Sequence, residues 1–297
     1  MKKIASIALV VITCSFTFLP KETQLHYVFK KGDAYEIVTV SSTTQHYTVA
    51  GTDQNVTQTL NSVLQMKIVD VLGTSAKFEV EYSKISSKAD SPMGANVMDS
   101  EGDTTNAMNK ALWSMKGKKF NFIMKKNGTV ESVENIDNLW SKVGAMKAAM
   151  EQSFGKNFFV RSIENVFAFY PEEKLKPGST WKNPSTLGTA LPLQVQNNWT
   201  LESVNEPNVV LVNDGAITTT DSTKVVSLQG GVKSLVNMKG RQVIKITASV
   251  AHGWPETSKS YYEVKGKMML QPGGQIPEEM EMQMEIKGEA EYMVKKK

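Results

Sequence analysis

The sequence predicts an α+β protein that is mainly β, a large twisted antiparallel sheet or open half-barrel with a central helical hairpin packed on it. Three observations lead to this prediction. Apolar and polar residues alternate along most of the 297 residues, as they do in strands with one buried face. Short turn signals such as Asn127-Gly128 separate the alternating segments. One central stretch, residues 135–171, changes to helical spacing.

The first block of strands is predicted over residues 25–134. Phe78, Val80 and Tyr82 alternate with charged residues on the second strand of a hairpin that turns at Gly73. Because successive side chains on a strand point to opposite faces, this hairpin is expected to have one buried face and one solvated face.

Residues 135–171 are predicted to form the helical hairpin. Apolar residues recur at intervals of three and four over residues 136–150, which is the spacing of one helix face. Gly155 interrupts this pattern. A second amphipathic stretch follows and ends at Pro171, because proline cannot continue a helix.

A second block of strands is predicted over residues 178–294. Residues 65–89 and 198–222 each read as strand, turn and strand, and residues 115–128 have a counterpart in 238–253. The preserved order indicates an internal duplication, so the sheet of about ten to twelve strands is expected to have two related halves. The alternative is that alternating strands resemble one another by composition alone.

The charges on the last two strands select their register. Pairing Lys265 with Glu285 also places Glu263 opposite Lys287, whereas a slip of two residues in either direction brings like charges together. Opposite charges that face each other across an antiparallel pair contribute about 0.2–1 kcal/mol, and like charges oppose pairing. The glutamates are therefore expected on the solvated face.

The other face of this hairpin is rich in methionine, and the same register places Met268 opposite Met282. Three interpretations remain open: a core packed under the helices, a hydrophobic-ligand wall, or a copper(I) site. The ligand wall would be lined by Met268, Met282, Met284 and Ile286. Copper is disfavoured because the sequence nearby offers no His or Cys, and no cofactor is predicted.

Residues 1–19 are predicted to be an export signal. Two lysines precede an apolar run that is shorter than the roughly 20 residues of a membrane-spanning helix. Cys14, at the end of this run, is a candidate lipidation site, and the alternative is an incidental cysteine in a discarded signal peptide. Residues 20–297 are then expected to form one β-rich module in the periplasm, anchored to the outer membrane, or secreted.

Composition and motifs argue against several classes of protein. The net charge of +4, to which Lys2 and Lys3 contribute, is too small and too scattered for a partner such as nucleic acid. His26, His46 and His252 are far apart and lack metal-ligand spacing. The sequence has no nucleophile elbow, phosphate loop or dinucleotide fingerprint, so we expect neither a metal site nor catalytic activity. We also expect the protein to be a monomer.

Several stretches distributed along the chain are informative together: "FKKGDAYEI", "SPMG", "MKGKKFNFIMKKNGTVESVENID", "FAFYPEEKLKPGSTW", "LPLQVQNNWTL", and "MKGRQ" followed by "GW". With these stretches the sequence resembles a family of exported Bacteroidetes-type proteins, domain-of-unknown-function family 6263. They cover most of the chain after the signal. The resemblance implies export and a single module, and it supplies no activity and no site residues.

Three functions remain open at this point. The first is a non-enzymatic envelope protein that binds a lipid, another hydrophobic ligand or another envelope component on its apolar sheet face. The second is a structural or interaction module with a fully packed core, whose partner is an envelope protein. The third is an unrecognised hydrolase. An elongated cavity beside the helices would favour the first, a closed interior the second, and convergent acidic or His groups in a cleft the third.

Overall fold

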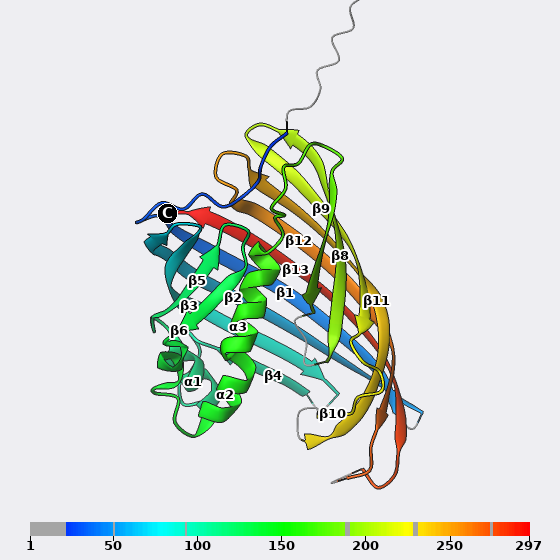
Figure 1. Cartoon of the computed structure of the whole chain (residues 1–297). Coiled ribbons are helices and arrows are strands. Elements are labelled where there is room, and N and C mark those ends of the chain that lie inside the picture. Colours follow the sequence, from blue (N-terminus) through cyan, green and yellow to red (C-terminus); the bar gives the residue numbers. More distant parts are fainter. Residues whose placement is uncertain (1–21, 50, 93, 188–190, 228–230, 274–275) are drawn as a thin grey trace, which may run out of the picture.

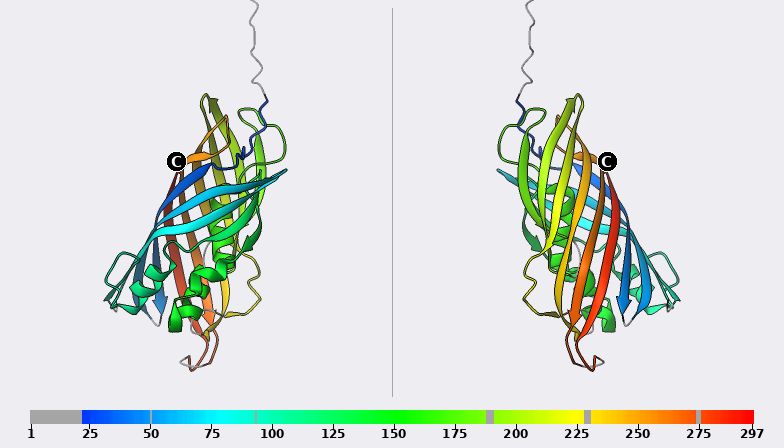
Figure 2. Two further views of the ribbon diagram at one scale, coloured as in Figure 1. Left: turned by 90° about the vertical axis from the view of Figure 1, so that its left-hand side faces the viewer. Right: turned by 90° about the vertical axis from the view of Figure 1, so that its right-hand side faces the viewer.

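A thirteen-stranded antiparallel sheet curves around helix α3 (Lys156–Phe167) in the computed structural model of the chain (Figures 1 and 2). The structure describes residues 22–49, 51–92, 94–187, 191–227, 231–273 and 276–297. The main path of the sheet ends at β6 (Val130–Glu134) on one side and at β7 (Thr180–Thr186) on the other, so the sheet is open. The predicted fold class is confirmed.

The first block of strands winds back and forth from the N-terminal side. Gly73 adopts the positive φ, +69°, that the tight turn between β2 and β3 requires. Strand β3 pairs with both β2 and β5, and the short β4 continues along β3. The strands that precede β6 are β1 (Ala34–Val49), β2 (Thr52–Leu72), β3 (Ser75–Ser91), β4 (Gly94–Asp99) and β5 (Phe120–Lys125).

The second block of strands completes the sheet by pairing its last strand, β13, with β1 from the first block. The order across the sheet is β6-β5-β3-β2-β1-β13-β12-β11-β9-β8-β7, with β10 paired to β11. Internal duplication of the two blocks stays a prediction. The strands that follow β7 are β8 (Leu193–Asn205), β9 (Asn208–Thr219), β10 (Val226–Ser227), β11 (Lys233–Ser249), β12 (Pro255–Leu270) and β13 (Met280–Lys296).

The register chosen by charge between β12 and β13 is confirmed. Lys265 pairs with Glu285, Glu263 with Lys287, and Met268 with Met282. The Glu285 carboxylate lies 2.7 Å from the Lys287 ammonium and 3.2 Å from the Lys265 ammonium. Hydrogen bonds from these two lysines lower the pKa of Glu285 to about 2. The glutamates therefore belong to a mutually compensating charged face.

The helices depart in detail from the predicted hairpin. Gly144, at a φ of +65°, interrupts the first stretch, which forms two short 3-10 turns, η1 (Ile136–Trp140) and η2 (Gly144–Met146), before α2 (Lys147–Phe154). Only Gly155 separates α2 from α3, in an extended conformation that ends one helix and begins the next. An additional helix, α1 (Ala107–Met115), was not expected from the sequence.

Two apolar clusters fill the concave side. The larger lies beneath α3 and is rich in aromatic side chains, with Trp254 in contact with Tyr27, Tyr35 and Phe167. The smaller lies over the other end of β8, β9 and β11 to β13 and contains no helical residue. Its members are Leu187, Leu193, Val195, Ile217, Val236, Met238, Val264, Met268, Leu270, Met282 and Ile286.

His252 gives the fold a predicted pH dependence. Burial, followed by the nearby charge of Lys296, lowers the pKa of His252 below its ordinary value. Its Nδ1 accepts a hydrogen bond from the backbone N–H of Trp254 at 3.3 Å. Nδ1 can accept this bond only when it is unprotonated, so the bond requires the neutral ring. The folded state thus binds this proton less readily than the unfolded chain. Stability contributed by His252 is full above the unfolded pKa of about 6.5 and is lost as the pH falls through the lower folded pKa.

We therefore expect the melting temperature to fall between about pH 7.5 and about pH 5.5, on either side of the ordinary histidine value. The variant His252→Gln should show a smaller decrease over the same interval. Comparing the two decreases cancels every contribution that the two proteins share. Equal decreases in both proteins would contradict a role for His252.

Candidate functional site

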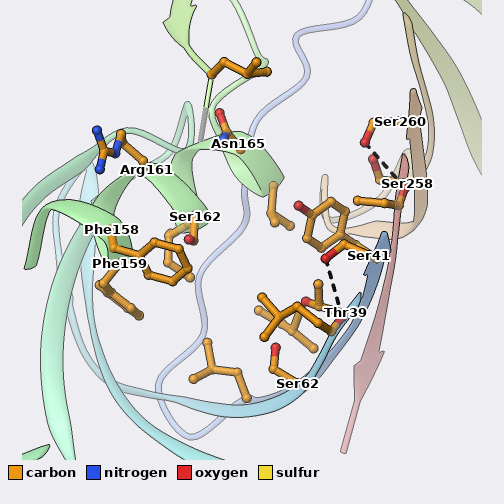
Figure 3. Close-up of a pocket in the computed structure, with 18 of the residues that line it drawn as sticks. Thr39, Ser41, Ser62, Phe158, Phe159, Arg161, Ser162, Asn165, Ser258 and Ser260 are labelled. Atoms are coloured by element: carbon orange, nitrogen blue, oxygen red, sulfur yellow. Dashed lines mark hydrogen bonds between the residues drawn. The ribbon is translucent and has the colours of Figure 1, made fainter. Parts of the chain in front are cut away.

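A cavity of about 230 Å³ lies between α3 and the concave face of the sheet (Figure 3). The side of the cavity formed by α3 contributes Phe159, Ile163 and Val166, and the sheet contributes further apolar walls through Ile37 and Leu64. Both walls consist mainly of apolar carbon, as is usual for sites that bind small molecules. The cavity adjoins both apolar clusters, since members of each line it.

Small inward-facing residues on the central strands provide the space. Ser41 on β1 lies opposite Ala290 on β13, which lies opposite Ser260 on β12. Since inward-facing residues of neighbouring strands line up across a sheet, these three side chains form one row of low volume under α3. The flanking strands return to large residues, with Leu60 on β2 and Ile244 on β11.

A second row carries hydroxyl groups across the same strands. Ser62, Thr39, Tyr292 and Ser258 pair in that order across β2, β1, β13 and β12. Figure 3 shows Thr39, Ser62 and Ser258 across the cavity from Ser162 of α3. Each of these rows therefore faces the helix rather than solvent.

The hydroxyl groups of these two rows, which form the floor of the cavity, differ in their hydrogen bonding. Ser41 donates to the Leu60 carbonyl and Ser260 donates to the Ala290 carbonyl, each at 3.4 Å. Within the described chain, the Thr39, Ser62 and Ser258 hydroxyls make no side-chain hydrogen bond, although Ser258 is only 3% exposed. Since these hydroxyls line the cavity and can both donate and accept, they are suited to bonding a molecule in it.

Helix α3 is held over the cavity from both edges of the sheet. The Glu164 carboxylate accepts a hydrogen bond from the Val130 N–H of β6 at 3.0 Å. On the other side, Asn183 of β7 donates to the Ala168 carbonyl at 2.6 Å, just beyond the helix. Trp181 adds a bond to the Phe169 carbonyl at 2.9 Å. The helix thereby bridges the opening between the two edge strands.

A polar groove of about 550 Å³ runs beside the cavity, between α3 and β7. Three residues line both spaces: Arg161, Asn165 and Thr186. We call these three residues the neck. Arg161 and Asn165 are one helical turn apart and therefore neighbours on the same side of α3. Sequence patterns did not indicate this site, because none of its residues belongs to a recognisable motif.

The residues predicted to line a ligand wall lie elsewhere. Met268, Met282, Met284 and Ile286 belong to or pack against the smaller cluster, and none of them lines the cavity. Met268 and Met282 are buried, and no residue of a described helix belongs to their cluster. Their role as a ligand wall stays a prediction. Cys14 and the export signal lie outside the described residues.

Among the described residues, no three His, Cys, Asp or Glu side chains gather as metal ligands would. His26, His46 and His252 lie apart, and none of them lines the cavity or the groove. No helix in the described part of the chain is both long enough and apolar enough to cross a membrane.

Comparison with protein families identifies the chain. A family model matches residues 73–255, more than half of the sequence. The chain belongs to DUF6263, a family of unknown function. The DUF6263 match begins at the turn before β3 and ends at the first residue of β12, so it includes α3 and the neck. It confirms the resemblance to this family, while the Bacteroidetes type and export stay predictions, and it carries no assigned activity.

Other comparisons add similarity without function. No protein with curated annotation matches the DUF6263 chain. Among solved structures, an outer membrane channel from Pseudomonas putida F1 is 7% identical, with 91% of this chain and 97% of that chain covered and a TM-score of 0.25. OccK7 (OpdD) from Pseudomonas aeruginosa is 5% identical, with 89% and 100% covered and a TM-score of 0.23. Scores this low support no conclusion about the chain.

Proposed function

We propose that the protein is an exported, non-enzymatic component of the bacterial cell envelope that binds a small hydrophobic or amphipathic molecule. The observation that carries the proposal is the cavity between α3 and the sheet, with its apolar walls and unbonded floor hydroxyls. A site of this composition holds a ligand mostly by apolar contact and orients it with a few polar groups. The export signal predicted over residues 1–19 supports the envelope location, with Cys14 as the candidate anchor.

The size of the cavity restricts the ligand. At about 230 Å³ it is smaller than the roughly 300–1,000 Å³ of sites for drug-sized molecules. A molecule with a single short chain or a few aromatic rings fits this space better than a lipid with two long chains. The floor hydroxyls of Thr39, Ser62 and Ser258 would bond a polar atom partway along such a molecule.

A substitution that fills the cavity tests the proposal. Ser41→Phe places an aromatic ring in the row of small residues, so we expect the affinity for the neutral fluorophore N-phenylnaphthylamine to fall about tenfold or more. Val40→Phe is the matched control, because Val40 is the preceding residue of β1, faces outward and is 49% exposed. Fluorescence titration of both variants and of the unaltered protein gives the three affinities.

Thermal melts should accompany these titrations, since adding volume to a packed site can cost about 1–3 kcal/mol. If Ser41→Phe does not fold, the smaller change Ala290→Leu serves the same purpose. Absence of binding by the unaltered protein, or equal binding by both phenylalanine variants, would reject the proposal. Either result would favour the interaction module with a packed core.

A further inference from the structure

Arg161 is one of only two arginines in the chain, and the two have opposite environments. Arg241 lies on the outer face and forms a two-pronged pair with Asp214, with distances of 2.7 and 2.8 Å. Arg161 lies on α3 at the neck, and no carboxylate of the described chain comes within the 4.0 Å of an ion pair. Arg161 is therefore a fixed positive charge without a described counter-charge.

The Arg161 guanidinium is also short of hydrogen bonds. Its Nε is buried and has no acceptor within the described chain. Burying a polar N–H without a partner costs free energy, and the cost is greater for a charged group. A planar guanidinium presents several N–H donors in a fork that matches carboxylate and phosphate oxygens. An acidic ligand at the neck would satisfy both the charge and the orphan donor.

The position of Arg161 places such an acid at the end of an apolar space. Arg161 and Asn165 line both the cavity and the polar groove, so a group bound by them would have the apolar cavity on one side and the groove on the other. Figure 3 shows Arg161 at the side of the cavity, away from the floor hydroxyls of Ser41 and Ser258. This arrangement separates the polar end of a ligand from its chain.

Other charged groups also lie around the neck and the cavity. The groove is also lined by Lys182 and by three carboxylates, of which Glu164 already accepts the Val130 N–H. Glu172 and Glu173 are exposed, so solvent screens their repulsion of an anion. Glu289, the other charged residue along the cavity, is exposed as well.

We infer that the site takes an amphiphile with one short chain and an acidic headgroup, the chain lying in the cavity and the carboxylate or phosphate bound by Arg161 and Asn165 at the neck. This inference rests on the proposed function, because it requires the cavity to bind a ligand. It adds the chemical class of the ligand and the residue that selects it. Carboxylate and phosphate share the same oxygen geometry toward arginine, so the test includes both.

Displacement of N-phenylnaphthylamine from the purified protein tests the inference with three ligands of equal chain length: decanoate, decyl phosphate and decanol. We expect at least one of the two anions to bind roughly tenfold to a hundredfold more tightly than decanol, as a charged hydrogen-bonded contact implies. Arg161→Met keeps the length and apolar stem of the side chain while removing its charge. It should reduce the affinity for the anion to about that for decanol, so that the preference for the anion disappears.

Two matched variants separate charge at the neck from charge in general. Arg241→Met removes the other arginine and should leave all three affinities unchanged. Arg161→Lys keeps the charge but loses the fork, so it should retain part of the preference for the anion. Whichever anion binds more tightly identifies the headgroup.

The outcomes distinguish failure of the headgroup inference from failure of the proposed function. If decanol and both anions bind the unaltered protein equally, or if Arg161→Met leaves the preference intact, the headgroup inference is overturned and the proposed function stands. If neither the fluorophore nor any of the ligands binds, the proposed function is overturned together with the inference.

Discussion

Replacing Trp254 with alanine is expected to destabilise the protein by about 3–5 kcal/mol, the range typical of removing a large buried aromatic side chain. Trp254 is 2% exposed and stacks on Tyr35 with ring centroids 3.9 Å apart. Trp254 also contacts Tyr27 and Phe167, so it joins the N-terminal segment, the sheet and the end of α3. Alanine would leave a void that these rings can fill only in part. Urea unfolding followed by circular dichroism measures the loss.

The matched control is Trp113→Ala. Trp113 lies on α1 and is 57% exposed, so the same substitution removes little buried surface. We expect its effect to stay within about 0.5 kcal/mol, as for most surface changes. Similar losses at both positions would mean that the aromatic cluster does not carry the stability that its packing indicates.

Replacing Gly128 with alanine is expected to cost about 3–4 kcal/mol, because two penalties combine. Gly128 forms the turn between β5 and β6 at a φ of +92°, where an L side chain is strained. An added Cβ would also collide with the backbone carbonyl of Phe167 at the end of α3. Backbone atoms at a helix terminus cannot move aside as a flexible side chain can. Either the turn or the helix must therefore shift.

Gly32→Ala carries the backbone strain without the collision. Gly32 has nearly the same φ, +94°, but a Cβ there would have no atom within 4 Å. Its cost should be the backbone strain alone, about 1–2 kcal/mol. The difference between the two variants then measures the contact between the β5–β6 turn and α3. Equal losses would show that this contact does not constrain the helix.

The Gly128 contact also bears on ligand binding. Phe167 is the last residue of α3, and its carbonyl additionally accepts a hydrogen bond from the buried Tyr27 hydroxyl at 3.0 Å. A shift of this end would change the distance between the helix and the cavity floor. The Gly128→Ala protein, where it remains folded, is therefore expected to bind N-phenylnaphthylamine more weakly than the Gly32→Ala protein.

The strands and their buried faces could be predicted because the evidence for them is local. In β3, Phe78, Val80 and Tyr82 are buried as their alternation predicts. The register of β12 with β13 could be predicted for a related reason: the two strands are consecutive, and their charges leave one favourable alignment. Such arguments need only neighbouring residues and the side-chain period of a strand.

Predictions that needed more than local pattern were less complete. Apolar spacing over residues 136–150 suggested one helix, but Gly144 adopts a positive φ and divides the segment. Helix α1 was not predicted because residues 107–115 were included in the first block of strands, although Asn106 caps the helix by accepting hydrogen bonds from two backbone N–H groups. Alternation predicts an apolar face for the methionines, and Met268 is buried on that face. The sequence alone does not indicate which end of the sheet stays open.

Short stretches of the sequence are enough to predict an open antiparallel sheet with helices on one face, because alternation, turns and helical spacing are local patterns. The position of the cavity, in contrast, depends on contacts between segments that are distant in the sequence. Ser41, Ala290 and Ser260 come from strands at opposite ends of the chain, and their small volumes create a cavity only when β1 pairs with β13. The isolation of Arg161 is likewise a tertiary property, since a charge lacks a partner only with respect to everything that folds around it.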